Sequence, residues 1–155
     1  MIRKAKMEDV PKIQKLINGF AAEGKMLPVA LGQLYENLRD FWVYEEKDRA
    51  CLPARVIACC RLHITWKDLG EIRSLAVAEK KQHQGIGALL LKRALKEAKK
   101  LNLKKIFALT YAPSFFEKYG FFRISKTRLP HKIWSECLNC PKFPKCDEIA
   151  LMKEL

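Results

Sequence analysis

The chain has 155 residues, of which 49% are hydrophobic, 30% charged and 10% aromatic, a balance that excludes a disordered protein and fits one soluble globular domain. Its longest uncharged stretch, residues 106–116, is far shorter than the roughly 20 apolar residues of a membrane-spanning helix, and the N-terminus lacks the apolar segment of a secretory signal. The formal charge of +13 favours anionic partners, and a cytoplasmic location is expected.

The first half of the chain predicts an alternation of strands and helices. Apolar residues at helical spacing after Glu8 predict a helix, which a short strand at residues 2–5 precedes. A second, short helix is predicted at residues 31–38. Three neighbouring antiparallel strands should follow, with a polar turn containing Asp48 and Pro53 between the first two; their ranges are 41–45, 55–65 and 71–77.

The second half contains the clearest helical pattern. Its apolar face runs from Leu90 to Leu101, and lysines and arginines occupy the opposite face. Further along, a buried strand is predicted at 106–110, a short helix at 114–119, and two strands at 121–125 and 149–153. Because there is no internal repeat or linker, the economical interpretation is a single α/β domain over residues 1–155, with a cysteine-containing loop at 129–148.

Two glycines stand where a strand leads into a helix. The segment Gln82-His83-Gln84-Gly85-Ile86-Gly87 follows the predicted strand 71–77. Backbone N–H groups at a helix N-terminus are unpaired, and glycine allows a phosphate to approach them closely. The segment therefore favours an anion site, with a plain tight turn as the alternative. Neither the dinucleotide fingerprint nor the nucleoside-triphosphate loop motif is present.

The Q-x-x-G-x-G spacing after Ser-Leu-Ala-Val resembles the acetyl-coenzyme A signature of the GCN5-related N-acetyltransferase (GNAT) superfamily. Separated segments over almost the whole chain resemble the single-domain N-acetylglutamate synthases of bacterial arginine synthesis: 27–28, 38–41, 71–77, 107–111, 115–121, 129–134 and 146–150. The resemblance implies a mixed, mostly antiparallel sheet, flanked by helices and split in a V between strands four and five. It also implies an enzyme that transfers an acetyl group from acetyl-CoA to L-glutamate.

The resemblance assigns the coenzyme to the end of the fourth strand and to the glycine turn. The residues implied in coenzyme binding are Leu75, Ala76, Val77, Gln82, His83, Gln84, Gly85, Ile86, Gly87 and Ala88. An acceptor amine must be neutral to attack, so a general base is expected, and Glu71 is the candidate. The alternative for Glu71 is a solvated acid at the end of a strand.

The acid that usually protonates the departing thiolate in this superfamily is a tyrosine, and Phe116 takes its position here. A thiol of ordinary pKa, about 8.5, leaves tolerably without full protonation. Ser114, Tyr111 or water are the candidates to replace the missing acid.

The two carboxylates of glutamate call for fixed cations, and arginine suits them because it binds a carboxylate through two hydrogen bonds. Arg73 is the first choice, since it lies two residues before Leu75 on the same side of an idealised strand. Lys132 and Arg128 are the second choices, with a solvated surface charge as the alternative for each. Another amino acid or a polyamine stays open as the acceptor, although a basic cleft disfavours a polyamine.

The six cysteines fall into two groups. Apolar surroundings predict buried, reduced thiols at Cys51, Cys59 and Cys60. The C-x2-C-x5-C cluster near the C-terminus would complete a Cys3His zinc site with His131; its members are Cys137, Cys140 and Cys146. Reduced structural thiols or a disulfide are the alternative, because a second ligand pair is missing.

A function of a different class also competes. The basic helix and the cysteines are compatible with a small nucleic-acid-binding protein that has a zinc-ribbon-like tail. The helix lacks interleaved aromatic residues, and there is only one C-x2-C pair, so nucleic acid is not an expected partner. The expected partners are small molecules, acetyl-CoA and L-glutamate. The sequence leaves the oligomeric state open, a homodimer included.

Overall fold

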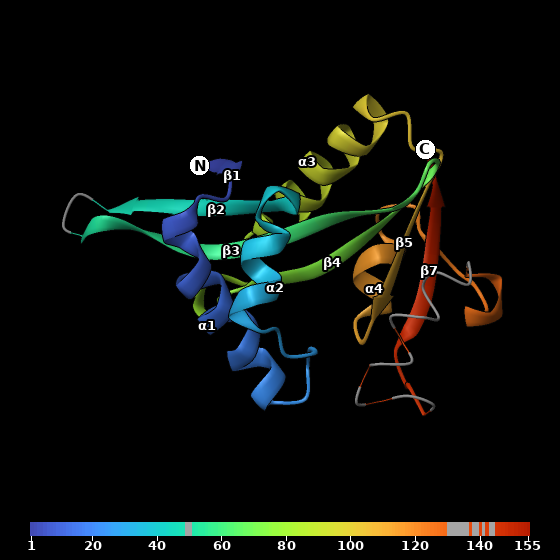
Figure 1. Ribbon diagram of the computed structural model, residues 1–155, viewed down its shortest axis with the longest axis horizontal. Coiled ribbons are helices and arrows are strands. Elements are labelled where there is room, and N and C mark those ends of the chain that lie inside the picture. Colours follow the sequence, from blue (N-terminus) through green and yellow to red (C-terminus); the bar gives the residue numbers. More distant parts are fainter. Residues whose placement is uncertain (49–50, 130–136, 138–139, 141, 143–144) are drawn as a thin grey trace.

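Seven strands form one sheet in the order β1-β2-β3-β4-β5-β7-β6 (Figure 1). The computed structural model describes residues 1–48, 51–129, 137, 140, 142 and 145–155. The strands are β1 (Ile2–Lys4), β2 (Phe41–Asp48), β3 (Cys51–Trp66), β4 (Leu69–Val77), β5 (Lys105–Thr110), β6 (Phe122–Arg123) and β7 (Ile149–Glu154). All neighbouring strands pair antiparallel except β4 and β5, which pair parallel. The predicted α/β class with a mixed, mostly antiparallel sheet is confirmed.

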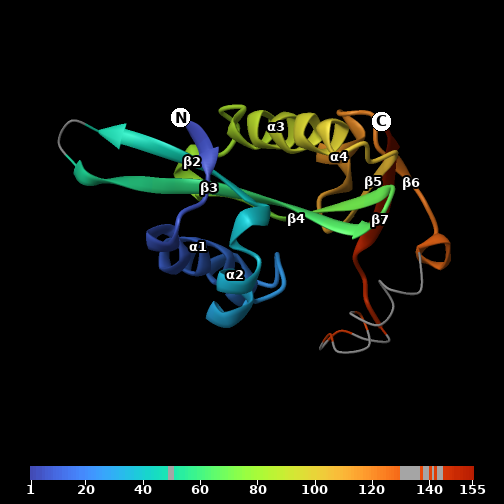
Figure 2. The ribbon, with the colours of Figure 1, turned by 45° about the horizontal axis from the view of Figure 1, so that its top comes forward.

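Helices cover both faces of the sheet, with α3 on one face and α1 and α2 on the other (Figure 2). The helices are α1 (Val10–Ala22), α2 (Leu31–Glu36), α3 (Ile86–Lys100) and α4 (Pro113–Glu117), and the 3-10 turns are η1 (Met7–Asp9), η2 (Leu38–Asp40), η3 (Glu79–Lys81) and η4 (Lys126–Arg128). None of the helices in the described part of the chain combines the length and apolar character needed to span a bilayer.

Alternation along β3 explains the two layers. Ala58 and Leu62 pack in the core cluster that contains the apolar face of α3, whereas Cys59 packs with Ile13 of α1 on the opposite face. Successive side chains of a strand point to opposite faces, so one strand serves both cores. The stripe predicted along α3 is confirmed at Leu90, Ala94 and Ala98, which are fully buried. Its predicted last member, Leu101, follows the end of α3 and is exposed.

The sheet opens between β4 and β5. These strands pair only at Leu69↔Lys105, Gly70↔Ile106 and Glu71↔Phe107, at the start of each strand. Beyond Glu71, β4 follows β3, while β5 continues along β7. A bulge bends β4 at this point: the register with β3 shifts between Cys59 and Arg61, and Ser74 has a φ of +50°. The V-shaped split that the family resemblance implied is therefore present.

Some predicted boundaries were wrong. Pro53 was expected in the turn after the first long strand, yet it lies within β3. The register with β2 shifts between Glu46 and Asp48, and a residue without a backbone N–H is tolerated at such an irregularity. The strand predicted at 121–125 is reduced to the two residues of β6, and α2 ends at Glu36, before the 3-10 turn η2.

A buried ion pair joins β1 to the start of α1. Arg3 donates two hydrogen bonds to the Asp9 carboxylate, at 2.6 and 3.1 Å, and a third to Glu45 of β2 at 3.0 Å. The backbone N–H of Lys6 also donates to Asp9, at 2.8 Å. Since Asp9 is only 1% exposed, these bonds replace its hydration and fix the first turn of the helical segment against the sheet.

Candidate active site

Four polar side chains form a block on the α1 side of the sheet, beside the opening between β4 and β5. Arg61 and His63 lie on β3, and their register partners on β4 are Arg73 and Glu71 respectively. Directly opposite residues of an antiparallel pair share a face, as do residues two apart on one strand. The pairing of the two strands therefore gathers two arginines, a histidine and a glutamate, and these four residues are called the polar block below.

Glu71 and Arg73 form the central contact of the polar block. Arg73 Nε donates to Glu71 Oε2 at 2.5 Å. Glu71 is 4% exposed and lies in the third position of β4, so its interpretation as a solvated acid at a strand end is wrong.

Asp40 of η2 supports the β3 side of the polar block. Its Oδ2 accepts from Arg61 Nε at 3.2 Å and lies 3.1 Å from His63 Nδ1. Arg61 Nη2 lies 2.9 Å from the same ring nitrogen, so the histidine tautomer decides whether Nδ1 bonds to Asp40 or to Arg61. Burial raises the pKa of the Asp40 carboxyl, but the hydrogen bond from His63 and the charge of Arg61 outweigh it and hold the pKa below its ordinary value.

A second buried acid, Glu148, directly precedes β7. It is 9% exposed, and burial raises the pKa of its carboxyl despite the positive charges of Lys142, Lys126 and Arg73. The charge of Arg73 acts on the Glu148 carboxyl, so Glu148 is close enough to the polar block to interact with it electrostatically. Sequence reasoning missed both Asp40 and Glu148, because each becomes relevant only through packing between distant segments.

The candidates for protonating the thiolate lie after β5. The Tyr111 hydroxyl donates to Asp147 Oδ1 at 2.7 Å and accepts a hydrogen bond from Lys142 Nζ. Ser114 is exposed on α4. Phe116 is buried and packs edge-on against Phe115 and Phe121, with ring centroids 5.2 Å apart in each pair. Phe116 therefore serves as core, and the choice between the two hydroxyls stays a prediction.

The glycine turn has the backbone of an anion cradle. His83 and Gly85 both have positive φ values, +61° and +79°, and Gly85 is the N-cap of α3. No side chain caps this helix, so the first N–H groups of α3 have no partner within the helix. Where left-handed residues alternate with right-handed ones, consecutive backbone N–H groups point toward one side, and a phosphate oxygen can accept hydrogen bonds from them. The residues present therefore fit the pyrophosphate of a coenzyme.

The side chains around this turn connect it to the opening of the sheet. Gln82 Nε2 donates to the Val77 carbonyl at 3.0 Å, which ties the turn to the end of β4. A Cβ added to Gly87 would lie 3.6 Å from both Val77 and Phe115, so the start of α3, the end of β4 and α4 meet here. Leu75 and Val77 are partly buried beside the α3 core, whereas Ala76 is buried in the α1 core. The prediction that Arg73 and Leu75 share one side of the strand was wrong, because the bulge at Ser74 turns Leu75 toward the α3 side while Arg73 stays on the side of the polar block.

The predicted metal site receives no support from the structure. Cys137, Cys140 and Cys146 form no disulfide, and within the described residues no group of three His, Cys, Asp or Glu side chains could hold a metal ion. His131, the fourth expected ligand, lies outside the described residues, as does Lys132. The cysteine cluster was the main support for a nucleic-acid-binding protein with a zinc-ribbon-like tail, and this alternative is therefore weakened.

The remaining predicted residues are found as follows. Cys59 and Cys60 are buried and form no disulfide, as expected, and burial raises the pKa of the Cys59 thiol to about 12. The side chain of Cys51 lies outside the described part. Arg128 is exposed on η4, and no described contact brings it to Arg73.

Comparison with known proteins identifies the family. The model of the acetyltransferase (GNAT) family matches residues 12–121. The chain belongs to this family. Among the relatives of this GNAT protein is an uncharacterized N-acetyltransferase of Chlorobaculum tepidum, 38% identical over 154 residues that cover 99% of this chain and 96% of the relative. An amino-acid acetyltransferase of Mycobacterium tuberculosis is 38% identical over 137 residues, 88% of this chain and 76% of the relative.

Solved structures agree with the family assignment. A Mycobacterium tuberculosis protein in complex with CoA superposes on the whole GNAT chain and on 99% of its own, with a TM-score of 0.84 and 30% identity. N-acetylglutamate synthase from Neisseria gonorrhoeae, complexed with coenzyme A and N-acetyl-glutamate, gives the same TM-score at 24% identity, with 35% of that chain covered. The second likeness shows the shared fold. The GNAT chain is thus an N-acetyltransferase by family.

Proposed function

We propose that residues 1–155 form one N-acetyltransferase domain that transfers an acetyl group from acetyl-CoA to the amino group of L-glutamate, a first step of arginine synthesis. The contact between Arg73 and Glu71 beside the opening of the sheet carries this proposal, because it places a carboxylate-binding cation next to a buried base. Two relatives support the acceptor class by name: amino-acid acetyltransferases of Mycobacterium tuberculosis and of Buchnera aphidicola, which are 38% and 32% identical.

The donor side of the proposal rests on the glycine turn. The N–H groups of residues 82–88 would hold the pyrophosphate, and the segment 75–77 would border the pantetheine arm. When bound, acetyl-CoA supplies the acetyl group as an activated thioester. The position of this segment at the splayed end of β4 supports the assignment, since the strands part beside it.

On the acceptor side, binding of the substrate carboxylate is coupled to deprotonation of the substrate ammonium group. Arg73 Nε lies 2.5 Å from Glu71 Oε2. A substrate carboxylate that takes over hydrogen bonds of Arg73 weakens this contact and leaves the Glu71 carboxylate available to accept the ammonium proton. Lys132 and Arg128 remain the candidates for the second carboxylate. Ser114 and Tyr111 remain the candidates for the thiolate proton.

An acceptor panel tests the substrate. With acetyl-CoA, glutamate should be acetylated much faster than lysine or spermidine, and glutamine should fall between them because it keeps only the α-carboxylate. Arg73→Leu should raise the Michaelis constant for glutamate by roughly one to two decades, corresponding to the ~1.5–3 kcal/mol of a charge-assisted hydrogen bond. The measurement is the initial rate of thiol release at varied acceptor concentration.

Arg123→Leu is the matched control, because Arg123 is an exposed arginine paired with Glu117 on the far part of the sheet. It should leave the Michaelis constant for glutamate unchanged. Faster acetylation of lysine or spermidine than of glutamate would exclude the proposed substrate and leave the fold assignment intact. Equal glutamate constants for the wild type and Arg73→Leu would place the carboxylate clamp elsewhere.

The coenzyme site is tested by adding one methyl group. Gly87→Ala introduces a Cβ at ordinary van der Waals distance from its protein neighbours, so the fold should tolerate it. A bound pyrophosphate approached by this N–H would be crowded, and the dissociation constant for acetyl-CoA should rise at least tenfold in calorimetry. Gly32→Ala is the control, since its added Cβ meets no atom within 4 Å. Unchanged affinity in a folded Gly87→Ala variant would remove Gly87 from the cradle.

A further inference from the structure

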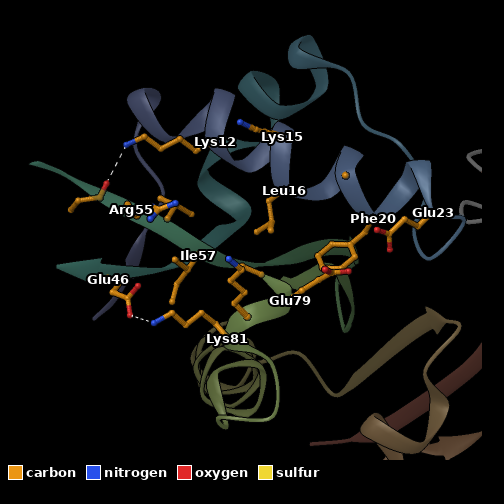
Figure 3. A pocket seen from close by; sticks show the side chains of 15 residues that line it. Lys12, Lys15, Leu16, Phe20, Glu23, Glu46, Arg55, Ile57, Glu79 and Lys81 are labelled. Carbon is orange, nitrogen blue, oxygen red and sulfur yellow. Dashed lines mark hydrogen bonds and ion pairs between the residues drawn. The ribbon is translucent and has the colours of Figure 1, made fainter. Parts of the chain in front are cut away.

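A groove of about 720 Å³ lies on the α1 side of the sheet, outside the opening between β4 and β5 (Figure 3). Its walls come from α1, from the first part of β3, and from η3, the turn that follows β4. The volume falls within the range of small-molecule sites, roughly 300–1,000 Å³. The polar block and the glycine turn do not contribute to its lining.

The floor of the groove is apolar. Leu16 and Phe20 project from α1 toward Ile57 of β3, as the close-up shows (Figure 3). Ile57 is buried, while Leu16 and Phe20 are half-buried and belong to the edge of the α1 core. An apolar body such as a planar ring would cover these three side chains and remove their exposed surface from water.

The groove keeps an excess of positive charge after its acids are paired. Glu46 accepts from Lys81 at 2.5 Å, and Lys25 lies 2.5 Å from Glu23 and 3.7 Å from Glu79. These three acids are the ones that line the groove, so two lysines face three carboxylates. The one negative charge left over is outnumbered by the further cations of the lining, Lys12, Lys15, Arg55 and Lys80.

These remaining cations come from all three walls. The side chains of Lys15 on α1, Arg55 on β3 and Lys80 on η3 make no hydrogen bond or ion pair with any residue in the described part of the chain. Lys12 spans the groove and donates to the Ala54 carbonyl at 3.3 Å. Several like charges converge on one hollow, so a ligand with more than one negative charge is favoured over a singly charged one.

We propose that this groove binds a nucleoside polyphosphate at a site separate from the coenzyme cleft. The apolar floor takes the base, and Lys15, Arg55 and Lys80 take the phosphates. Leu16 and Phe20 of the groove pack with the α1 core, whereas Ile57 and Ala78 pack with the core under α3. The groove therefore lies beside η3, which directly precedes the glycine turn, and none of residues 82–88 lines it. This proposal does not depend on the identity of the acetyl acceptor.

The test measures ATP binding to the full chain by calorimetry, in the presence of saturating CoA and without added metal. ATP should bind despite the CoA, and inorganic triphosphate, which lacks the base, should bind at least tenfold more weakly. The double variant Lys15→Ala/Arg55→Ala should weaken ATP binding at least tenfold, and its Michaelis constant for acetyl-CoA should stay unchanged. Both replaced residues are exposed, so the fold should be retained.

A second double variant supplies the matched control. Lys92→Ala/Lys96→Ala removes two exposed charges from the solvent face of α3, and ATP should bind it within twofold of the wild type. Equal weakening in both double variants would mean attraction by surface charge alone and would overturn the proposal. It would also be overturned if CoA abolished ATP binding or if inorganic triphosphate bound as tightly as ATP.

Discussion

Glu71→Gln is expected to lower the turnover number at neutral pH by roughly one hundredfold or more, the usual contribution of a general base. The glutamine keeps the size of the side chain and an oxygen that can accept from Arg73 Nε, which now lies 2.5 Å from the carboxylate. It cannot accept a proton from the substrate ammonium. The affinity for acetyl-CoA should stay within twofold, because Glu71 precedes the coenzyme segment on β4. The measurement is the dependence of kcat on pH, compared with the wild type.

Glu148→Gln provides the sharpest comparison for this result. Glu148 is the other buried acid within reach of Arg73, and burial raises the pKa of its carboxyl. If Glu71 is the base, the acidic limb of the pH–rate profile should disappear in Glu71→Gln and persist in Glu148→Gln. The reverse outcome would transfer the role to Glu148, and two unaltered profiles would contradict a carboxylate base in this site.

Asp9→Ala is expected to lower the free energy of unfolding by about 3 kcal/mol at neutral pH, the lower end for breaking a buried ion pair. The change removes the acceptor of two Arg3 bonds and of the Lys6 N–H. Arg3 keeps Glu45 as a partner, which limits the loss. Denaturant unfolding measures the difference. Glu117→Gln is the control, because it breaks the exposed pair with Arg123 and should change the stability little.

The effect of Asp9 should depend on pH in a definite direction. Burial raises the pKa of Asp9, but the hydrogen bonds from Arg3 and Lys6 outweigh it, so the pKa in the folded protein lies below the ordinary 3.8. The stability from the ionised carboxylate is therefore present above pH 3.8 and is lost as the pH falls through the folded-state pKa. The difference in the free energy of unfolding between the wild type and Asp9→Ala should therefore become smaller as the pH falls below 3.8. A difference that stays constant or grows below this pH would mean that ionisation of Asp9 does not stabilise the fold.

Local patterns predicted much of the fold because they report directly on burial. The apolar stripe of α3 identifies a helix and the face that it buries, and the apolar and β-branched run at 55–65 identifies a strand; both elements are present in the structure. Pro53 was misplaced because proline usually ends a strand, whereas here the shifted register with β2 accommodates it. Such a register depends on pairing between segments and leaves little trace in either strand alone.

The candidate site likewise contains some features that the sequence predicts and others that it does not. The glycine turn was predictable, since its residues are contiguous and glycine permits the positive φ that Gly85 adopts. The partnership of Arg61 with Asp40 was not predictable, because 21 residues separate them and η2 brings them together. The burial of Glu71 likewise depends on neighbours from several elements, which is why a solvated acid remained an equal alternative in the sequence.

The sheet consists of two parts, called leaves here, which are joined by the short parallel pairing of β4 with β5. One leaf contains β1 to β4 and the other contains β5, β7 and β6, and backbone pairing joins them at only three positions. Side-chain packing joins them in two further places: under α3, where Ile106 and Leu151 of the second leaf contact the same core as Leu62 of the first, and in a separate cluster in which Leu69 of β4 packs with Phe107 and Met152. Amide protons of β5 and β7 can then exchange through an opening of the smaller leaf that leaves the larger leaf folded.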